Sequence, residues 1–369
     1  MPEKKFTLLH THDTLELYCT LYPFIVSKYS RHVNFHYFPN QLTSTRNHPV
    51  LFTRIFKGRF DDTQFINQTL DQLKTSFSSI HFLDDNAGAD SFHFEFIDRL
   101  GSYYKGKLPV DLSTSEKSLY GRQIFSDHYN NELGIMDYND ESIREPLSDL
   151  SQLKKVKPAF NLGYGLYPLP SNGSLIRKTT YGLCKINRIN YLKPYILYEH
   201  QKQIRQLSQK KEYSKKRLKV SARFRYSGYP NSIAYQRKLM EQLASGKSAF
   251  LTGLIPRDQY LKELSEVFVT LSPFGYGEVC LRDFEAILNG SLLIKPDMSH
   301  MKSFPNIYIP DETYIPVKWD GSDLLDKVDD ILSNPKSYTH IIESAREVYR
   351  NALIKIDMHV EERFNSLLN

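Results

Sequence analysis

Residues 272–290 read SPFGYGEVCLRDFEAILNG. A proline and two glycines fall within the first six residues, and a helical pattern carrying Glu278, Arg282 and Glu285 runs from there to Gly290. Glycine lets a backbone approach a ligand closely, and residues at i, i+4 and i+7 share one helix face. The stretch therefore predicts a flexible loop that leads into a helix with a charged face.

Predicted strands and helices alternate on both sides of this stretch. Hydrophobic runs predict strands at 218–224, 248–253, 267–273, 291–296 and 306–310, and helical spacing predicts helices at 232–244 and 257–266. This alternation is typical of a parallel, doubly wound α/β sheet, in which ligands bind beyond the carboxyl ends of the strands. The loop lies at such an end, beside a helix N-terminus that favours anions.

The loop and its helix allow two interpretations. In the functional one, Gly275 and Gly277 let the backbone approach a phosphate, and Arg282 binds a diphosphate. Glu285 would then accept two hydrogen bonds from a ribose diol. In the structural one, Glu278, Arg282 and Glu285 form an exposed ladder of ion pairs that adds little stability.

The carboxyl-terminal part of the chain also resembles a known family. Its marks are GLIPRDQYLKEL (253–264), SPFGYGEVCLRDFEAILNGSLLIKPD (272–297), YIPVKWDGSDLLDKVDDILSNP (314–335) and HVEERFNSLL (359–368). In order and type these segments resemble GT-B glycosyltransferases of the "glycosyl transferases group 1" type, over residues 217–368. The resemblance implies two Rossmann-like domains that face a cleft. It also implies a last helix, with the apolar stripe Val360, Phe364, Leu367 and Leu368, that crosses back to the amino-terminal domain.

The same resemblance implies where a nucleotide sugar would bind. Residues that match Arg282 and Glu285 contact the diphosphate and the ribose in that family. Gly253 is implied to pass near the base, and Arg223 or Arg225 to approach phosphate. The implied donor site is completed by Gly275, Tyr276, Gly277 and Glu278. Many relatives have an acidic residue followed by Gly-Phe-Gly in this loop, whereas this chain has Phe-Gly-Tyr-Gly-Glu.

The amino-terminal half predicts a second, acceptor-side Rossmann-like domain. Strands are predicted at 5–13, 49–56 and 80–86, with a helix at 65–77 between the last two. We place the boundaries at 1–190 for this domain, 191–216 for a basic linker or helical segment, and 217–369 for the nucleotide-sugar-binding domain.

Two polar strand ends in this half supply candidate catalytic residues. The sequence HTHD offers His10, His12 and Asp13, and FLDDN offers Asp84 and Asp85. A transferred hydroxyl must lose a proton, and His or Asp within hydrogen-bond reach can take it. We select His12, Asp13 and Asp85; the alternative is that they are ordinary hydrogen-bonded polar residues.

FLDDN also resembles the metal-binding turn of GT-A glycosyltransferases, but the strict Asp-x-Asp pattern is absent. GT-B enzymes usually stabilise the departing nucleotide with positive side chains and helix dipoles instead. We therefore expect no bound metal and no cofactor besides the nucleotide-sugar co-substrate.

Residues 201–219 carry eight Lys or Arg against one Glu. Such a segment can bind an anionic membrane surface, or nucleic acid with Tyr191, Tyr195 and Tyr198 as stacking groups, or it can be a solvated helix face. Because only this segment is strongly basic, we expect nucleic acid not to be the partner.

Composition limits the remaining choices. The chain has 369 residues, 40% of them hydrophobic, which suits two folded domains and excludes general disorder. Cys19, Cys184 and Cys280 are widely spaced, which predicts reduced thiols and no structural zinc. The amino terminus is interrupted by charge and no long apolar run follows, so we expect a cytoplasmic location, or a peripheral one on the inner face of a membrane.

The sequence thus predicts a metal-independent GT-B glycosyltransferase that moves a sugar from a nucleotide diphosphate to a glycan or lipid-linked saccharide. The alternatives are a nucleotide-sugar epimerase or a phosphorylase on the same fold, a metal-dependent GT-A transferase, and a nucleic-acid-binding protein. Donor sugar, base, linkage and stereochemical outcome depend on loops whose geometry the sequence does not fix.

Overall fold

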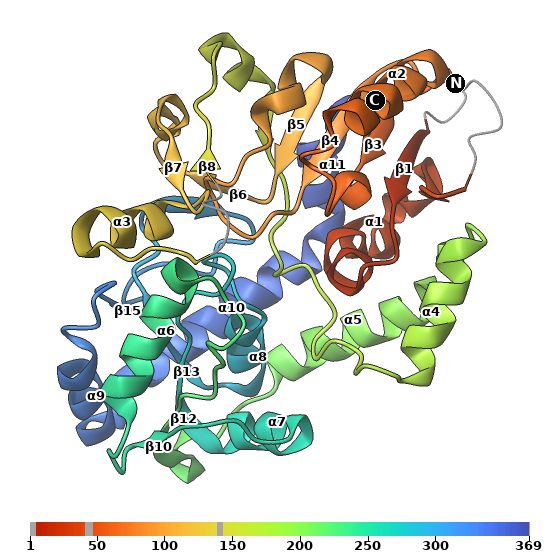
Figure 1. The fold of residues 1–369 in the computed structure, drawn as a ribbon. Coiled ribbons are helices and arrows are strands. Elements are labelled where there is room, and N and C mark those ends of the chain that lie inside the picture. Colours follow the sequence, from red (N-terminus) through yellow and green to blue (C-terminus); the bar gives the residue numbers. More distant parts are fainter. Residues whose placement is uncertain (1–4, 41–46, 139–142, 369) are drawn as a thin grey trace.

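The computed structural model describes residues 5–40, 47–138 and 143–368. It is an α/β protein built on two parallel sheets, one in the upper and one in the lower half of Figure 1. No helix in these three ranges is both long and apolar enough to cross a bilayer.

The first sheet has six strands in the order β2-β1-β3-β4-β5-β9, all parallel. They are β1 (Phe6–His10), β2 (Val33–Tyr37), β3 (Val50–Phe52), β4 (Ile80–Asp84), β5 (Ser102–Lys105) and β9 (Val156–Pro158). The predicted strands 5–13, 49–56 and 80–86 are present but shorter, because each ends where polar residues turn away from the sheet. Helix α2 (Thr63–Ser76) joins β3 to β4, as predicted, and Asp62 caps its first turn.

The second sheet has five parallel strands in the order β11-β10-β12-β13-β15. They are β10 (Arg217–Ser221), β11 (Phe250–Leu251), β12 (Val267–Leu271), β13 (Leu292–Pro296) and β15 (Ile315–Val317). The prediction of a strand at 306–310 is wrong. That segment runs in irregular backbone, with Ile307 and Tyr308 buried in the core, and the fifth strand is β15 instead.

Both sheets have the same strand order when their strands are numbered along the chain: 2-1-3-4-5, with β9 added at the edge of the first. In such sheets the order reverses between the first and third strands, and the crevice at their carboxyl ends is where ligands bind. These switch points lie between β1 and β3 in the first sheet and between β10 and β12 in the second.

Helices cover the sheets and connect them. They are α1 (Tyr22–Val26), α3 (Ile124–Leu133), α4 (Leu175–Lys185), α5 (Lys193–Ser208), α6 (Asn231–Ala244), α7 (Arg257–Glu266), α8 (Leu281–Asn289), α9 (Leu324–Ser333), α10 (Thr339–Ile354) and α11 (Ile356–Leu368). A short antiparallel ribbon also links the halves, because β6 (Lys107–Pro109) pairs with β14 (Met301–Ser303). A second antiparallel ribbon follows β6 in the chain and consists of β7 (Leu119–Tyr120) and β8 (Ile143–Arg144).

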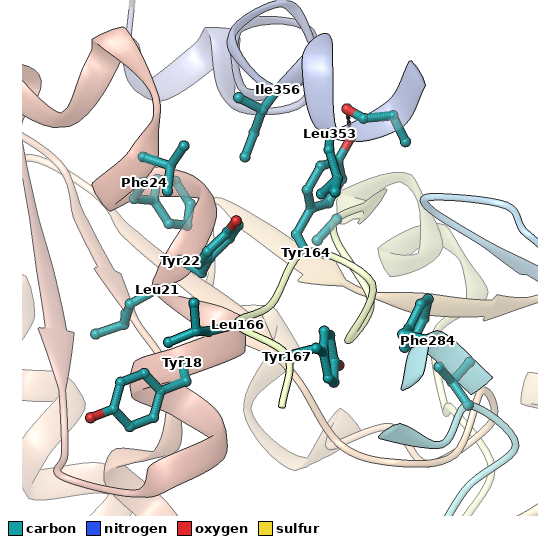
Figure 2. Close-up of a cluster of buried hydrophobic side chains, with 14 of the residues drawn as sticks. Tyr18, Leu21, Tyr22, Phe24, Tyr164, Leu166, Tyr167, Phe284, Leu353 and Ile356 are labelled. Carbon is teal, nitrogen blue, oxygen red and sulfur yellow. Dashed lines mark hydrogen bonds between the residues drawn. The ribbon is translucent and has the colours of Figure 1, made fainter. Parts of the chain in front are cut away.

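One hydrophobic cluster spans both halves of the molecule. Figure 2 shows Phe24 of α1 and Tyr164 of the connecting segment near Ile356 of α11, with Phe284 of α8 in the same cluster. The Phe364 ring of α11 lies 4.8 Å from Phe24 and 4.7 Å from Tyr104 of β5. The last helix therefore crosses back and packs on the first sheet, as predicted. Full burial of such aromatic groups is worth about 1.5–3 kcal/mol each.

The basic segment 201–219 lies in the end of α5, the following turn and β10, and several of its charges have partners within the protein. Lys216 donates to the carbonyls of Ser265, Val267 and Asn289, and Lys219 donates to Ser248. Arg217 pairs with Glu266, Lys202 with Glu199 and Lys215 with Glu212. Part of this charge thus stabilises the fold, so fewer basic side chains are left to contact a membrane or a nucleic acid.

Candidate functional site

A pocket of about 730 Å³ lies between the two halves, at the switch point of the second sheet. Its floor is the loop after β12 and the first turns of α8, and the first half contributes Thr14, Leu15 and Ala87. We call it the arginine pocket because five arginines line it: Arg177, Arg223, Arg237, Arg257 and Arg282. Glu285 is the only carboxylate among the residues that line it. The excess of positive charge favours a multiply charged anion.

Arg282 of α8 has hydrogen-bonding capacity that the protein leaves unused. Its Nη2 donates to the carbonyl of Arg223 at 3.0 Å, and its guanidinium lies 5.7 Å from the Phe224 ring. Its Nε is buried and has no hydrogen-bond partner among the described residues. A buried guanidinium with a free donor costs free energy unless a ligand satisfies it.

Glu285 lies one turn further along α8 and faces the same pocket. It accepts a hydrogen bond from the Tyr260 hydroxyl at 3.2 Å. Burial raises the pKa of Glu285, although the charge of Arg282 opposes that shift. The carboxyl group keeps acceptor capacity for hydroxyls. The alternative of an exposed ion-pair ladder is wrong, because Arg282 and Glu285 both line the pocket rather than face open solvent.

Glu278 does not belong to this helix face, which corrects the prediction. Helix α8 begins at Leu281, so Glu278 precedes it, and its side chain is fully buried outside the pocket wall. It accepts from the Ala89 N–H at 3.2 Å and lies 3.3 Å from His300 Nε2. Burial opposes ionisation, but the contact with His300 keeps the pKa of Glu278 below its ordinary value. In this position Glu278 links the loop to the first half.

A Cβ would meet backbone at Gly277 but only the end of the Arg237 side chain at Gly275, so space excludes a side chain most strictly at Gly277. Neither has a positive φ, but a Cβ on Gly275 would lie 2.8 Å from Arg237 Nη2. A Cβ on Gly277 would lie only 1.9 Å from the carbonyl oxygen of Ala87, across the boundary between the halves. Tyr276 between them is 54% exposed, and its ring lies 4.5 Å from that of Tyr229. The loop thus brings the halves into contact and presents an aromatic pair to the pocket.

The remaining residues of the predicted donor site are near this pocket, but not all line it. Arg223 lines it and is held by Glu263 at 2.8 Å and by the carbonyls of Thr252 and Gly253. Gly253 has φ +77°, is exposed and does not line the pocket, whereas its neighbours Leu254 and Ile255 do. Arg225 contributes its carbonyl, which accepts from Arg237 Nη1 at 2.7 Å. The sequence analysis missed Arg177, Arg237 and Arg257. Which face of a helix lines a pocket depends on the elements packed around that helix, and the sequence of the helix alone does not show them.

A second pocket, of about 450 Å³, lies at the switch point of the first sheet, and we call it the aspartate pocket. It shares Leu15, Ala87, Leu162 and Tyr276 with the arginine pocket, so the two cavities adjoin. Among the residues that line it are Thr53, Arg54, Lys57, Asp84, Asp85, Asn86, Lys107 and Gln123. Two reactants bound in the two pockets would meet at Tyr276.

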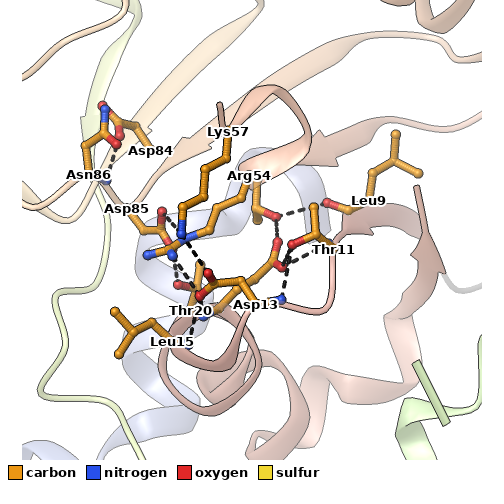
Figure 3. Close-up of polar contacts among 12 residues, drawn as sticks. Leu9, Thr11, Asp13, Leu15, Thr20, Arg54, Lys57, Asp84, Asp85 and Asn86 are labelled. Carbon is orange, nitrogen blue, oxygen red and sulfur yellow. Dashed lines mark hydrogen bonds and ion pairs between the residues drawn. The ribbon is translucent and has the colours of Figure 1, made fainter. Parts of the chain in front are cut away.

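An ion-pair network stands at the edge of the aspartate pocket (Figure 3). Arg54 Nε lies 2.7 Å from Asp85 Oδ2, and Arg54 Nη1 lies 2.7 Å from Asp13 Oδ1. Lys57 also pairs with Asp13, and the Thr20 hydroxyl donates to Asp85. Burial works against ionisation of Asp13, but the charges of Arg54 and Lys57 together bring its pKa below the ordinary value. Asp13 and Asp85 therefore lie on either side of Arg54, and both are held by cations; their catalytic role stays a prediction.

The other polar groups of this half are placed away from solvent or away from the pocket. Asp84 is buried against Lys105 at 2.8 Å and Tyr103, although it also lines the aspartate pocket. His12 is exposed, 3.1 Å from the Tyr37 hydroxyl, and lines neither pocket. Burial lowers the pKa of His10 to about 4. In the described ranges no group of three His, Cys, Asp or Glu side chains is arranged to hold a metal ion.

Sequence patterns did not single out Glu16, a fully buried carboxyl group next to the network. Its Oε2 accepts from the Thr11 N–H at 2.9 Å, and Thr53 donates to Oε1. Burial raises the pKa of Glu16 to about 7, and the charge of Asp85 adds to that shift. Its neighbours in sequence, TLELYCT, contain no signal of this burial, because Thr53 comes from another strand end.

Comparison with known proteins gives structural neighbours only. No family model matches the sequence, and no curated relative was found. One neighbour is an alpha-glucosyltransferase in complex with UDP and a 13-mer DNA containing a HMU base (TM-score 0.47, 9% identity, 100% of both chains). A second is Anabaena HepE in complex with UDP-glucose (TM-score 0.40, 11% identity, 98% of this chain and 100% of that one). A third is a glycosyltransferase from Rickettsia africae (TM-score 0.40, 11% identity, 100% of both chains). At these values, substrate and activity must be argued from the chain's own pockets.

Proposed function

We propose that the protein is a glycosyltransferase whose nucleotide-sugar donor binds in the arginine pocket. The observation that carries the proposal is the pocket's charge: five arginines and one carboxylate, at a switch point and beside the N-terminus of α8. A diphosphate carries the complementary charge, and the helix terminus adds N–H donors. The resemblance of residues 272–297 to a GT-B donor loop supports the same assignment.

Each group would have a definite task in this pocket. Arg282, with its free Nε, and the first N–H groups of α8 would stabilise the negative charge that develops on the nucleoside diphosphate as the glycosidic bond breaks. Glu285 would accept hydrogen bonds from a ribose diol. The aromatic pair of Tyr229 and Tyr276 would pack against the base or the sugar.

The acceptor would bind in the aspartate pocket, where its hydroxyl could approach the donor at Tyr276. Asp85 is the carboxylate best placed to receive the proton of that hydroxyl, because it lines this pocket and Asp13 does not. We keep a glycan or lipid-linked saccharide as the acceptor and a cytoplasmic or peripheral membrane location as proposals. Metal independence is part of the proposal: Lys105 and Arg54 already occupy the two carboxylates a metal would need.

The experiment is a thermal-shift panel with UDP, GDP, dTDP, ADP and CMP, each in Mg²⁺ and in EDTA. A nucleotide at 100 times its dissociation constant adds about 2.7 kcal/mol to the free energy of unfolding. Stabilisation by one nucleoside diphosphate in EDTA, lost in Arg282→Met, supports the proposal. Stabilisation only with Mg²⁺ would favour a metal-dependent transferase, and no shift with any nucleotide would contradict the donor site. Product formation from donor alone would indicate an epimerase.

A further inference from the structure

Lys107 of β6 is a buried cation that the fold does not use. Its side chain lines the aspartate pocket, and the residue is only 2% exposed. The main chain of Lys107 pairs with Ser303 of β14, but within residues 5–40, 47–138 and 143–368 its ammonium group, which faces the cavity, forms no side-chain hydrogen bond and no ion pair. The two carboxylates nearest to it in the pocket are occupied, Asp84 by Lys105 and Asp85 by Arg54.

An ammonium group in such a position costs free energy. Burial of a charge without a partner is unfavourable because its lost hydration is not replaced, so we expect an apolar residue in its place not to destabilise the fold. Burial, followed by the charge of Lys105, lowers the pKa of Lys107 to about 8, while Asp85, Glu278 and Asp84 act in the opposite direction. The group is therefore still largely cationic at neutral pH and lacks a counterion.

The same pocket contains an unused acceptor. Gln123 Nε2 donates to the carbonyl of Tyr276 at 2.6 Å, which fixes the orientation of the amide. Its Oε1 is buried and has no hydrogen-bond partner among the described residues. The aspartate pocket therefore offers one cation without an anion and one oxygen without a donor, and Gln123 lies beside Tyr276, one of the four residues that both pockets share.

We propose that the aspartate pocket binds an acidic acceptor, whose phosphate or carboxylate pairs with Lys107 and whose hydroxyl donates to Gln123 Oε1. That this ligand acts as the acceptor of a sugar rests on the proposed function. Its binding to the aspartate pocket does not. A neutral saccharide would leave Lys107 without a counterion, whereas an acidic one satisfies both groups. The volume of about 450 Å³ suits a ligand of one or two sugar units.

The experiment measures binding of three probes by calorimetry: glucose 6-phosphate, glucuronate and glucose. The protein is saturated with whichever nucleoside diphosphate stabilises it, so that the arginine pocket is occupied. We expect one or both acidic probes to bind about 10- to 100-fold more tightly than glucose, as for a charge-assisted hydrogen bond. The phosphate and carboxylate arms tell which acid the site prefers.

Two variants test the assignment to Lys107. Lys107→Met should abolish the preference for acidic probes without loss of thermal stability, and Lys302→Met is the matched control. Lys302 lies on the partner strand β14, in register with the residue next to Lys107, and is exposed. The control should keep the preference.

The outcomes separate this inference from the proposed function. Equal or absent binding of all three probes by the native protein would overturn the inference, as would a Lys107→Met variant that keeps the preference. If nucleotides bind and the acidic preference is absent, the inference fails while the donor site stands. If acidic probes bind through Lys107 but no nucleotide binds, the proposed function fails and the acidic site stands.

Discussion

The two switch points of this molecule have the same strand order but differ in charge: cations are in excess at the second, and cations and anions pair with one another at the first. At the second sheet, arginines converge on a cavity with one carboxylate among the lining residues, and Arg282 keeps a donor free. At the first sheet, Arg54, Asp13, Asp85 and Lys57 neutralise one another in a closed network. Lys107 stands outside that network.

This difference shows that strand topology decides where a cavity lies and side chains decide what it does. A closed ion-pair network neutralises its own charges, whereas the arginine pocket has more cations than anions among its lining residues and so favours an anionic ligand. Substitutions within the ion-pair network of the first switch point should therefore destabilise the fold, whereas substitutions in the arginine pocket, or at Lys107 outside that network, should affect mainly binding.

The largest effect is expected from Asp85→Ala. Removal of this carboxylate leaves Arg54, whose side chain is 12% exposed, with Asp13 as its one ion-pair partner among the described residues. Breaking a buried pair from one side costs about 3–5 kcal/mol. Urea denaturation should show this loss of unfolding free energy. An unchanged midpoint would show that the network is not structural.

Next is the pH dependence that Glu16 creates. Because its pKa is raised from 4.5 to about 7, the folded state binds its proton more tightly than the unfolded state. Its contribution is fully present below pH 4.5 and is lost as pH rises to about 7. We expect stability to fall by about 3 kcal/mol over this window relative to Glu16→Gln. Parallel curves of unfolding free energy against pH for the two proteins would contradict this.

Arg282→Met tests the second switch point, where we expect an effect on binding rather than on stability. Loss of a charge-assisted hydrogen bond should weaken nucleotide binding by about 1.5–3 kcal/mol. Stability should change little, because among the described residues the guanidinium donates to the Arg223 carbonyl and otherwise contacts the Tyr260 hydroxyl, without an ion pair. Calorimetry gives the affinity and thermal denaturation the stability. A variant that unfolds but still binds nucleotide would reverse the roles of the two switch points.

The smallest effect is expected from Gly277→Ala. The new methyl group would meet the Ala87 carbonyl, so the loop must shift away from the first half. Such overpacking costs about 1–3 kcal/mol. Gly134→Ala also adds a methyl group and has open space there, although its φ of +63° brings its own strain. Only Gly277→Ala should also weaken nucleotide affinity; equal affinities would show that the loop position does not matter.

The second sheet was largely predictable because its signals are local. VFVTL and LLIKP are mainly apolar strands, and the helix LRDFEAILN is followed by Gly290, a residue that commonly ends helices. Strands β2 and β5 were missed because VNFHY and SYYK are polar or aromatic, and they become strands only by pairing with β1 and β4. Similarly, Glu16 and Lys107 owe their character to burial by distant segments. The domain boundaries at 190 and 216 and the roles of His12, Asp13 and Asp85 stay predictions.

The packing of α11 on the first sheet also decides when, during synthesis, the core of the first half can be completed. Residues 356–368 leave the ribosome after every strand of both sheets, yet Phe364 fills a place between Phe24 and Tyr104 that the first 105 residues create. Until then the nascent first half exposes an apolar slot, and such surfaces promote aggregation. The early half of the chain therefore completes its core only when synthesis of the late half is over.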